Sequence, residues 1–190
     1  VPGSPLAGQS SYNLWGFYLQ ETIAFKNKLF FTVAGRNDAS TIFAKENRSQ
    51  FYPKVSASYV LSDEKFMENS VVSSARLRAS WGESGSLTAI TPYARFTNYS
   101  TGTLIGNSAF TLEGLKQGNL DIKPEKSSTY EIGADLGLMK DRLNLSFNYY
   151  NADIKDLLLP VQLAPSSGST NTIQNVGQMN NKGIELGLRY

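Results

Sequence analysis

The chain has 190 residues, a formal net charge of +2, 18% charged residues and 12% aromatic residues. Its basic residues are scattered, so no electrostatic footprint for nucleic acid appears, and its charged share lies below that of ordinary soluble domains. It contains no Cys and no His, which excludes disulfides and thiolate metal sites, removes the commonest metal ligand and general base, and leaves no cofactor to predict.

The hydropathy pattern predicts no membrane-spanning helix, because no run of 18 apolar residues occurs. Strands of a membrane β-barrel, however, cross a bilayer with only about 9–11 residues of alternating polarity. No signal peptide is recognisable at Val1. If the protein is exported, we therefore expect these residues to be an internal piece of a longer precursor.

Alternation of apolar and polar residues recurs along the chain and predicts seven strands. In the first strand the odd positions from Trp15 to Phe25 are apolar except for Glu21. The strands are expected at Tyr12–Phe25, Leu29–Arg36, Phe51–Ser62, Val71–Trp81, Thr129–Met139, Leu143–Asp153 and Gly177–Tyr190.

The connectors alternate between short and long. The short ones are Lys26–Lys28, Asp63–Ser70 and Lys140–Arg142, and the long ones are Asn37–Gln50, Gly82–Lys126 and Leu157–Gln174. A soluble sandwich has no reason to place every long loop at one end, whereas membrane barrels have short periplasmic turns and long outer loops. The fold class predicted is all-β, an antiparallel transmembrane β-barrel segment. Seven strands would leave two open edges, so we expect a larger barrel around them.

The two faces of these strands differ in chemistry. The apolar face carries aliphatic residues expected to point outward to lipid, namely Leu19, Val55, Leu77, Ile132, Leu145 and Leu186. Aromatic residues near the strand ends suit two interfacial girdles: Phe25, Phe31, Tyr59, Phe51, Trp81 and Tyr130. The polar face supplies the lumen-lining candidates, which are Arg36, Lys54, Arg76, Arg78, Glu131, Asp135, Glu185 and Arg189. In a soluble sandwich the same charged residues would simply face water.

Catalysis and metal binding are not expected. Glu131 and Asp135 lie roughly 13 Å apart along one strand face, too far for a retaining carboxylate pair, so we expect them to line the lumen and pair with arginines. Arg76 and Arg78 form either a cationic patch toward a plug or an anionic solute, or a cross-strand pair with acidic residues such as Glu131. The second interpretation is favoured.

The longest connector offers aromatic residues for binding. Tyr93, Phe96, Tyr99 and Phe110 suit stacking on sugar faces, because a ring is a rigid apolar platform. They equally suit packing within the loop or against a capping partner. The segment Asp121–Glu125 is expected to lead the chain back to the barrel wall, because Pro124 favours an extended residue before it.

Four segments, in this order, resemble the SusC/RagA group of TonB-linked outer-membrane proteins. They are FYPKVSASY (51–59), LRASWGESG (77–85), NLDIKPEK (119–126) and NVGQMNNKGIEL (175–186). With the strands between them, the resemblance runs from about Tyr12 to Tyr190.

The resemblance implies a barrel of about 22 strands, filled by an N-terminal plug. It implies an outer-membrane importer of glycans or peptide-like nutrients that is surrounded by lipid, energised through TonB and capped by a SusD-like lipoprotein. No plug, TonB-contacting segment or closing strand is recognisable in residues 1–190, so we expect a partial barrel. A passive porin or adhesin barrel and a soluble β-sandwich binding module are the alternatives.

Overall fold

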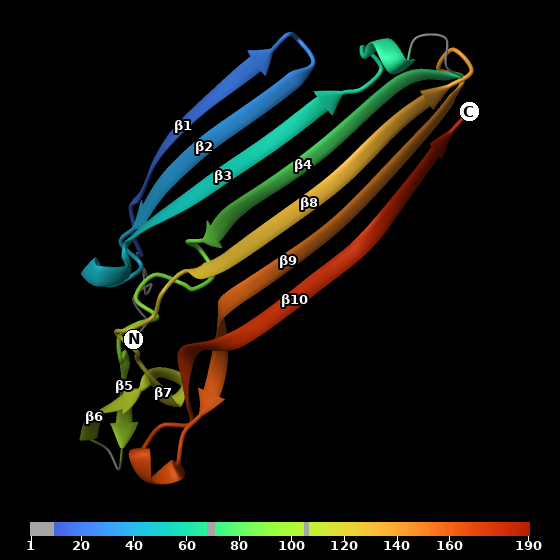
Figure 1. Cartoon of the computed structure of the whole chain (residues 1–190). Helices are drawn as coiled ribbons and strands as arrows, with labels where there is room; N and C mark the ends of the chain where they lie inside the picture. The colour runs from blue at the N-terminus through green and yellow to red at the C-terminus, as the bar shows by residue number, and fades with distance from the viewer. Residues whose placement is uncertain (1–9, 68–70, 105–106) are drawn as a thin grey trace, which may run out of the picture.

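Seven long strands build a single curved layer in the computed structural model (Figure 1), which describes residues 10–67, 71–104 and 107–190. Adjacent long strands are antiparallel throughout. The seven predicted strands are confirmed, with bounds β1 Leu14–Phe25, β2 Leu29–Ser40, β3 Ser49–Val60, β4 Val72–Ser86, β8 Glu125–Leu138, β9 Leu143–Gln162 and β10 Asn171–Arg189.

Three short strands complete the architecture. The main sheet has the order β1-β2-β3-β4-β8-β9-β10-β7, where β7 (Lys116–Gln117) pairs in parallel with β10. A separate hairpin consists of β5 (Tyr99–Leu104) and β6 (Asn107–Leu112). The helical turns are 3-10 turns of three residues at Lys45–Asn47, Lys65–Met67, Glu113–Leu115 and Pro165–Ser167. Within the described ranges, no helix is long and apolar enough to cross a membrane.

Short and long connectors lie at opposite ends of the sheet, as their alternation along the chain predicts (Figure 1). The β1–β2 turn places Lys26 and Asn27 at φ 52° and 55°, in the left-handed region. Turns with two such residues match the right-handed twist of antiparallel strands and join them tightly. The two ends of the wall are therefore built differently, one from tight turns and the other from long loops.

The predicted connector Leu157–Gln174 is wrong in extent. β9 continues to Gln162 and β10 already begins at Asn171, so only residues 163–170 connect them. The register between the strands shifts on both sides of Gly177, and Asp156 adopts φ 58°. These bulges interrupt the alternation, and Pro160 reads as a loop signal, so the extension of both strands was hidden.

The predicted connector Gly82–Lys126 is also too long and not wholly irregular. β4 runs on to Ser86, β8 begins at Glu125, and β5, β6 and β7 lie between them. Similarly, β2 extends past Arg36 to Ser40. The residues that extend these strands are mostly polar. The alternation of apolar residues therefore ends before the backbone hydrogen bonding between the strands does.

The cross-strand register defines two faces, because directly paired residues share a face. Leu145 pairs with Leu136 and with Leu188, Ile132 pairs with Ala79 and Tyr149, and Val55 pairs with Val33 and Trp81. By this register the six aliphatic residues predicted to point outward all share one face, listed here with their exposure: Leu19 66%, Leu77 46%, Ile132 55%, Leu145 36%, Leu186 80%, and Val55 partly buried.

No second layer of described residues covers this aliphatic face (Figure 1). An apolar surface of this extent is not stable in water and marks a contact with lipid or protein. A soluble β-sandwich requires a second sheet against these side chains, and none lies against them among the described residues. Glu21, opposite Val33 on β2, is a charged residue among the aliphatic ones of this face. Acidic residues cost less at lipid-facing positions than Lys or Arg do.

Among the described residues, a compact hydrophobic cluster lies at the long-loop end. Ile42, Phe43, Ile90 and Ile122 are between 0% and 8% exposed and form one cluster. Leu158 and Ile173, from the extensions of β9 and β10, pack against it together with Leu87 and Ala94. The extended strands thus serve as a support for the loops above the wall.

Candidate functional site

The eight charged candidates all lie on the face opposite the aliphatic residues. Arg76 pairs with Asp135 across β4 and β8, and Glu185 pairs with Asn148 across β10 and β9. The cross-strand pairs of the remaining strands place five more candidates on this face, namely Arg36, Lys54, Arg78, Glu131 and Arg189. The wall therefore has one aliphatic face and one face on which charges of both signs are interspersed.

Arg78 makes a polar bridge over β8. Its Nε lies 3.0 Å from Asp135 Oδ2, and its Nη2 donates to Asn148 Oδ1 on β9 at 2.9 Å. The strand between them provides Gly133, where a Cβ would lie 2.5 Å from the Asn148 oxygen and 3.1 Å from Arg78 Nη2. Glycine at this position leaves the space in which side chains from two strands meet. The expected pairing of an arginine with an acidic residue of the next strand is confirmed for Arg78 and Asp135. The example Glu131 is not that partner, because the register places it opposite Ser80.

Several candidates gather around hollows on the polar face. Lys54, Arg78 and Glu131 line one of about 240 Å³. Asp135 and Arg189 line another of about 370 Å³ nearer the short turns.

Arg36 lies apart from these hollows. Its Nε donates to Asp38 Oδ2 at 2.6 Å, and Asp38 is 8% exposed and lies over Gly16 of β1. The polar face is thus a set of local pairs and hollows rather than one concentrated site.

The loop aromatics do not converge on one point. Tyr99 and Phe110 are diagonal neighbours on one face of the β5–β6 hairpin and are 64% and 79% exposed. The Arg95 guanidinium lies over the Phe96 ring, 4.4 Å from the ring centroid. Tyr93 adopts φ 67° and its carbonyl accepts from the Phe96 N–H at 2.9 Å.

Phe96 lines a cavity of about 330 Å³ at the long-loop end, together with Asn98, Glu113, Lys116 and Asn171. Asn171 and the buried Thr172 come from the part of β10 that sequence reasoning assigned to a connector. An aromatic ring among amide, hydroxyl and charged groups fits a neutral or zwitterionic polar ligand. The cluster of Asn and Thr residues was visible in the sequence, but its position beside Phe96 was not.

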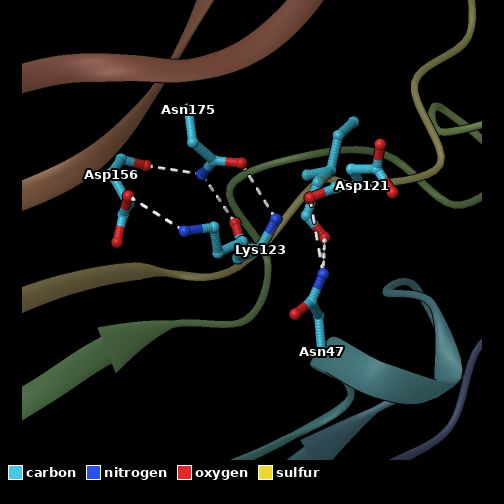
Figure 2. A network of polar contacts seen from close by, with 6 residues as sticks. Asn47, Asp121, Lys123, Asp156 and Asn175 are labelled. Atoms are coloured by element: carbon cyan, nitrogen blue, oxygen red, sulfur yellow. Dashed lines mark hydrogen bonds and ion pairs between the residues drawn. The ribbon is translucent and has the colours of Figure 1, made fainter.

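A polar network ties the loop segment 121–123 to the wall (Figure 2). The Asn175 side chain donates to the Lys123 and Asp156 carbonyls at 2.9 and 2.7 Å and accepts from the Lys123 N–H at 2.9 Å. Lys123 Nζ lies 3.5 Å from Asp156 Oδ1. Asn47 reaches the Asp121 carbonyl from the opposite loop at 3.4 Å. The bulged backbone at Asp156 therefore presents a carbonyl that orients the Asn175 side chain, and Asn175 in turn holds the returning loop at Lys123.

The polar face and the loops offer groups that suit the binding of polar molecules. In the part of the chain that the structure describes, no group of three or more acidic, His or Cys side chains could hold a metal ion. What the wall offers is a lipid-compatible face, a hydrated charged face and a structured set of loops at one end. This combination is that of a membrane barrel with an aqueous interior.

Residues 2–190 match the family model described as "TonB dependent receptor-like, beta-barrel". The chain belongs to this family. The SusC/RagA resemblance of the four segments is confirmed by relatives of that group. TonB-dependent receptor P26 of Formosa agariphila is 32% identical over 188 residues, which is 94% of this chain and 18% of the relative. TonB-dependent receptor SusC of Bacteroides thetaiotaomicron is 27% identical over 169 residues, which is 85% of this chain and 17% of the relative.

The solved structure of the RagAB peptide importer in its "closed-closed" state has the same fold. It superposes with a TM-score of 0.84 and is 26% identical, covering 93% of this chain and 19% of that chain. The chain therefore spans less than a fifth of the length of these relatives. Its sheet is a partial barrel wall, which explains why it is open at β1.

Proposed function

We propose that this chain is a wall segment of an outer-membrane TonB-dependent importer that takes up a glycan or peptide-like solute. The observation that carries the proposal is the two-faced wall, matched over residues 2–190 to the family of TonB-dependent barrels. One face carries aliphatic side chains for lipid, and the other carries ion pairs and hollows for an aqueous lumen or a plug.

The eight charged residues of the polar face are proposed to line the lumen. Their ion pairs support this role, because a barrel interior must keep charges hydrated or paired. The Arg78–Asp135–Asn148 bridge would brace three strands on the lumen side. The hollow between Lys54, Arg78 and Glu131 would receive a polar group of the plug or of a passing solute.

The long loops are proposed to face outward and contact the solute or a SusD-like lipoprotein. Phe96 and the amides around its cavity suit a sugar ring or a peptide bond. The exposed Tyr99 and Phe110 suit a protein lid. No catalytic role and no cofactor are proposed. Energy transfer from TonB would act through parts of the protein outside residues 1–190.

The test uses the full-length parent protein in its native host. A strain deleted for the gene would be complemented with the wild-type protein, and uptake of labelled oligosaccharides and labelled oligopeptides would be measured. We expect one solute class to enter only in the complemented strain, and a protonophore that collapses the proton gradient to abolish the entry.

Each alternative predicts a different result. A passive porin would continue to transport after the protonophore, and an adhesin would transport neither class. Recovery of the folded parent protein without detergent from the soluble fraction would overturn the membrane assignment itself.

A further inference from the structure

Glu21 lies on the aliphatic face of the wall. On β1 it alternates with Leu19 and Ile23, and across the ladder it is paired with Val33 of β2. Its side chain is exposed on this face, where Leu19 and Ile23 are 66% and 61% exposed. A charged side chain among lipid-facing aliphatic ones is costly, so such a residue marks a specific contact.

The position of Glu21 along β1 places it near the middle of the apolar band. The apolar residues of this face run from Trp15, toward the long-loop end, to Phe25 at the short turn. Ten residues span about 34 Å along a strand, or about 26 Å of height at the usual tilt, and the apolar band of such barrels is about 25 Å tall. Glu21 lies four residues before Phe25, at a height of about 10 Å above it. A glutamate side chain is too short to reach the water at either rim from there.

No described residue satisfies the Glu21 carboxylate. Its neighbours on the aliphatic face carry no polar side chain, and they are Leu19, Ile23, Phe31, Val33 and Gly35. The polar side chains beside it lie on the other face, where Thr22 Oγ1 is 2.9 Å from Thr32 Oγ1. Among the described residues, β1 has a neighbouring strand on one edge only. A partner for the carboxylate therefore comes from beyond the free edge of β1.

We propose that the strand that closes the free edge of β1 in the parent barrel carries a lysine or arginine opposite Glu21, on the aliphatic face. The chain covers 18% of a relative, and in a closed barrel every strand has a neighbour on both edges. Residues directly opposite each other share a face, and acidic and basic side chains inside a membrane pair with one another. The pair would fix the register of the two strands, because a slip of one residue would move the basic side chain to the lumen. This inference rests on the proposed function, since only a membrane barrel surrounds Glu21 with lipid.

The first experiment compares variants of the full-length parent protein in lipid vesicles by the midpoint of their thermal unfolding. E21L removes the carboxylate and leaves the basic partner alone in lipid, so we expect a lower midpoint than in the wild type. E21Q keeps the length of the side chain without its charge and should lower the midpoint as well. V33L, which enlarges the apolar residue opposite Glu21 on the same face, is the matched control and should leave the midpoint unchanged.

The opposite sign contradicts the proposal. If Glu21 had no partner, E21L would raise the midpoint, because a carboxyl group would be removed from lipid; a raised or unchanged midpoint therefore overturns the pair. A wild-type midpoint in E21Q overturns the basic character of the partner, since a neutral amide would then serve as well. Failure of the wild-type parent protein to reach the outer membrane contradicts the proposed function instead, so the two failures are distinguishable.

A second measurement identifies the partner directly and does not depend on stability. A photoreactive diazirine amino acid would replace Glu21 in the parent protein, and cross-linked peptides from native outer membranes would be identified by mass spectrometry. We expect cross-links to a strand of the same chain outside residues 1–190, in a peptide where a lysine or arginine is flanked by alternating apolar residues. Cross-links to a second copy or to another protein overturn the proposal, because Glu21 would then mark a contact between proteins. Cross-links to lipid alone overturn it as well.

Discussion

The long-strand wall and the loops above it are stabilised in different ways. The wall is a single layer with no second layer of described residues on its aliphatic face. In the proposed barrel, lipid would cover one face and the lumen would lie on the other. The loop end has its own core in Ile42, Phe43, Ile90 and Ile122. It is further tied by side-chain bonds to a strand bulge (Figure 2).

This difference teaches where each kind of substitution should act. In the wall, the cost of a change depends on which face receives it, because the solvent differs between faces. At the loop end, it depends on whether a buried backbone group loses its partner. The following expectations separate the two regimes, each measured on the full-length protein.

The largest effect is expected in the wall from Leu145→Arg. This side chain lies on the aliphatic face of β9, where an arginine near the bilayer midplane costs about 2–4 kcal/mol. The matched control is Ser146→Arg, one residue along and on the polar face opposite Asp135. Unfolding in detergent or lipid should show a large loss for the first and almost none for the second. Equal losses would mean that the two faces do not differ in solvent.

At the loop end, Asn175→Ala removes three hydrogen bonds to the backbone of Lys123 and Asp156. Two of these bonds are exposed and one is partly buried, so each should contribute about 0.5–1.5 kcal/mol. Hydrogen exchange should therefore accelerate in residues 119–124, while β3 and β4 keep their protection. Asn144→Ala, which removes one bond at the short turns, serves as the control. Unchanged hydrogen exchange in residues 119–124 would show that the hydrophobic core alone is enough to keep the loop ordered.

A smaller effect is expected from Gly133→Val on the polar face. The added side chain would displace Asn148 and Arg78 from their shared space over β8. The bridge is partly exposed, with 39% and 43% exposure of the Arg78 and Asp135 side chains, so its loss should cost about 1 kcal/mol or less. Asn148→Leu removes the same hydrogen bond without adding a side chain to β8. If Asn148→Leu leaves the unfolding midpoint unchanged, the bridge does not contribute to stability. Any loss of stability in Gly133→Val is then steric.

The wall was far easier to predict from the sequence than the loops. Leu143–Asp153 alternates because its two faces meet two solvents, and this constraint is local and periodic. The eight charged candidates fell on one face for the same reason. The extension of β9 to Gln162 had no such signal, because the register shifts around Gly177 interrupt the alternation there and Pro160 is typical of a loop.

The candidate binding features at the loop end depend on contacts between distant segments. Phe96 meets Asn171 in one cavity although the two are far apart in sequence. Asn175 was part of a family-like segment, yet only the positive φ of Asp156 explains its bonds. Arg78 was expected to pair with an acidic residue, but choosing Asp135 over Glu131 required the register of β4 against β8.

The smallest effect is expected at the short-turn end, where the Glu64 carboxylate accepts from Tyr59 Oη at 2.9 Å. This hydrogen bond lowers the pKa of Glu64, and the hydrogen bond from Lys28 is the second cause. A lowered folded-state pKa gives stability that is present above the ordinary glutamate pKa and is lost as pH falls through the lowered one. The stability difference between wild type and Tyr59→Phe should therefore be small near neutral pH and vanish in acid. A difference that is constant with pH would contradict this origin.

The most direct test of the two-faced wall is a nitroxide scan along β8 of the membrane-inserted parent protein, from Glu131 to Leu136, with single cysteines introduced in turn. The account predicts that labels at 132, 134 and 136 collide mainly with oxygen dissolved in lipid. Labels at 131, 133 and 135 should be shielded from lipid oxygen and should collide with a water-soluble nickel complex wherever the lumen is open. Accessibility that does not alternate with a period of two, or oxygen contact confined to the odd positions, would contradict it.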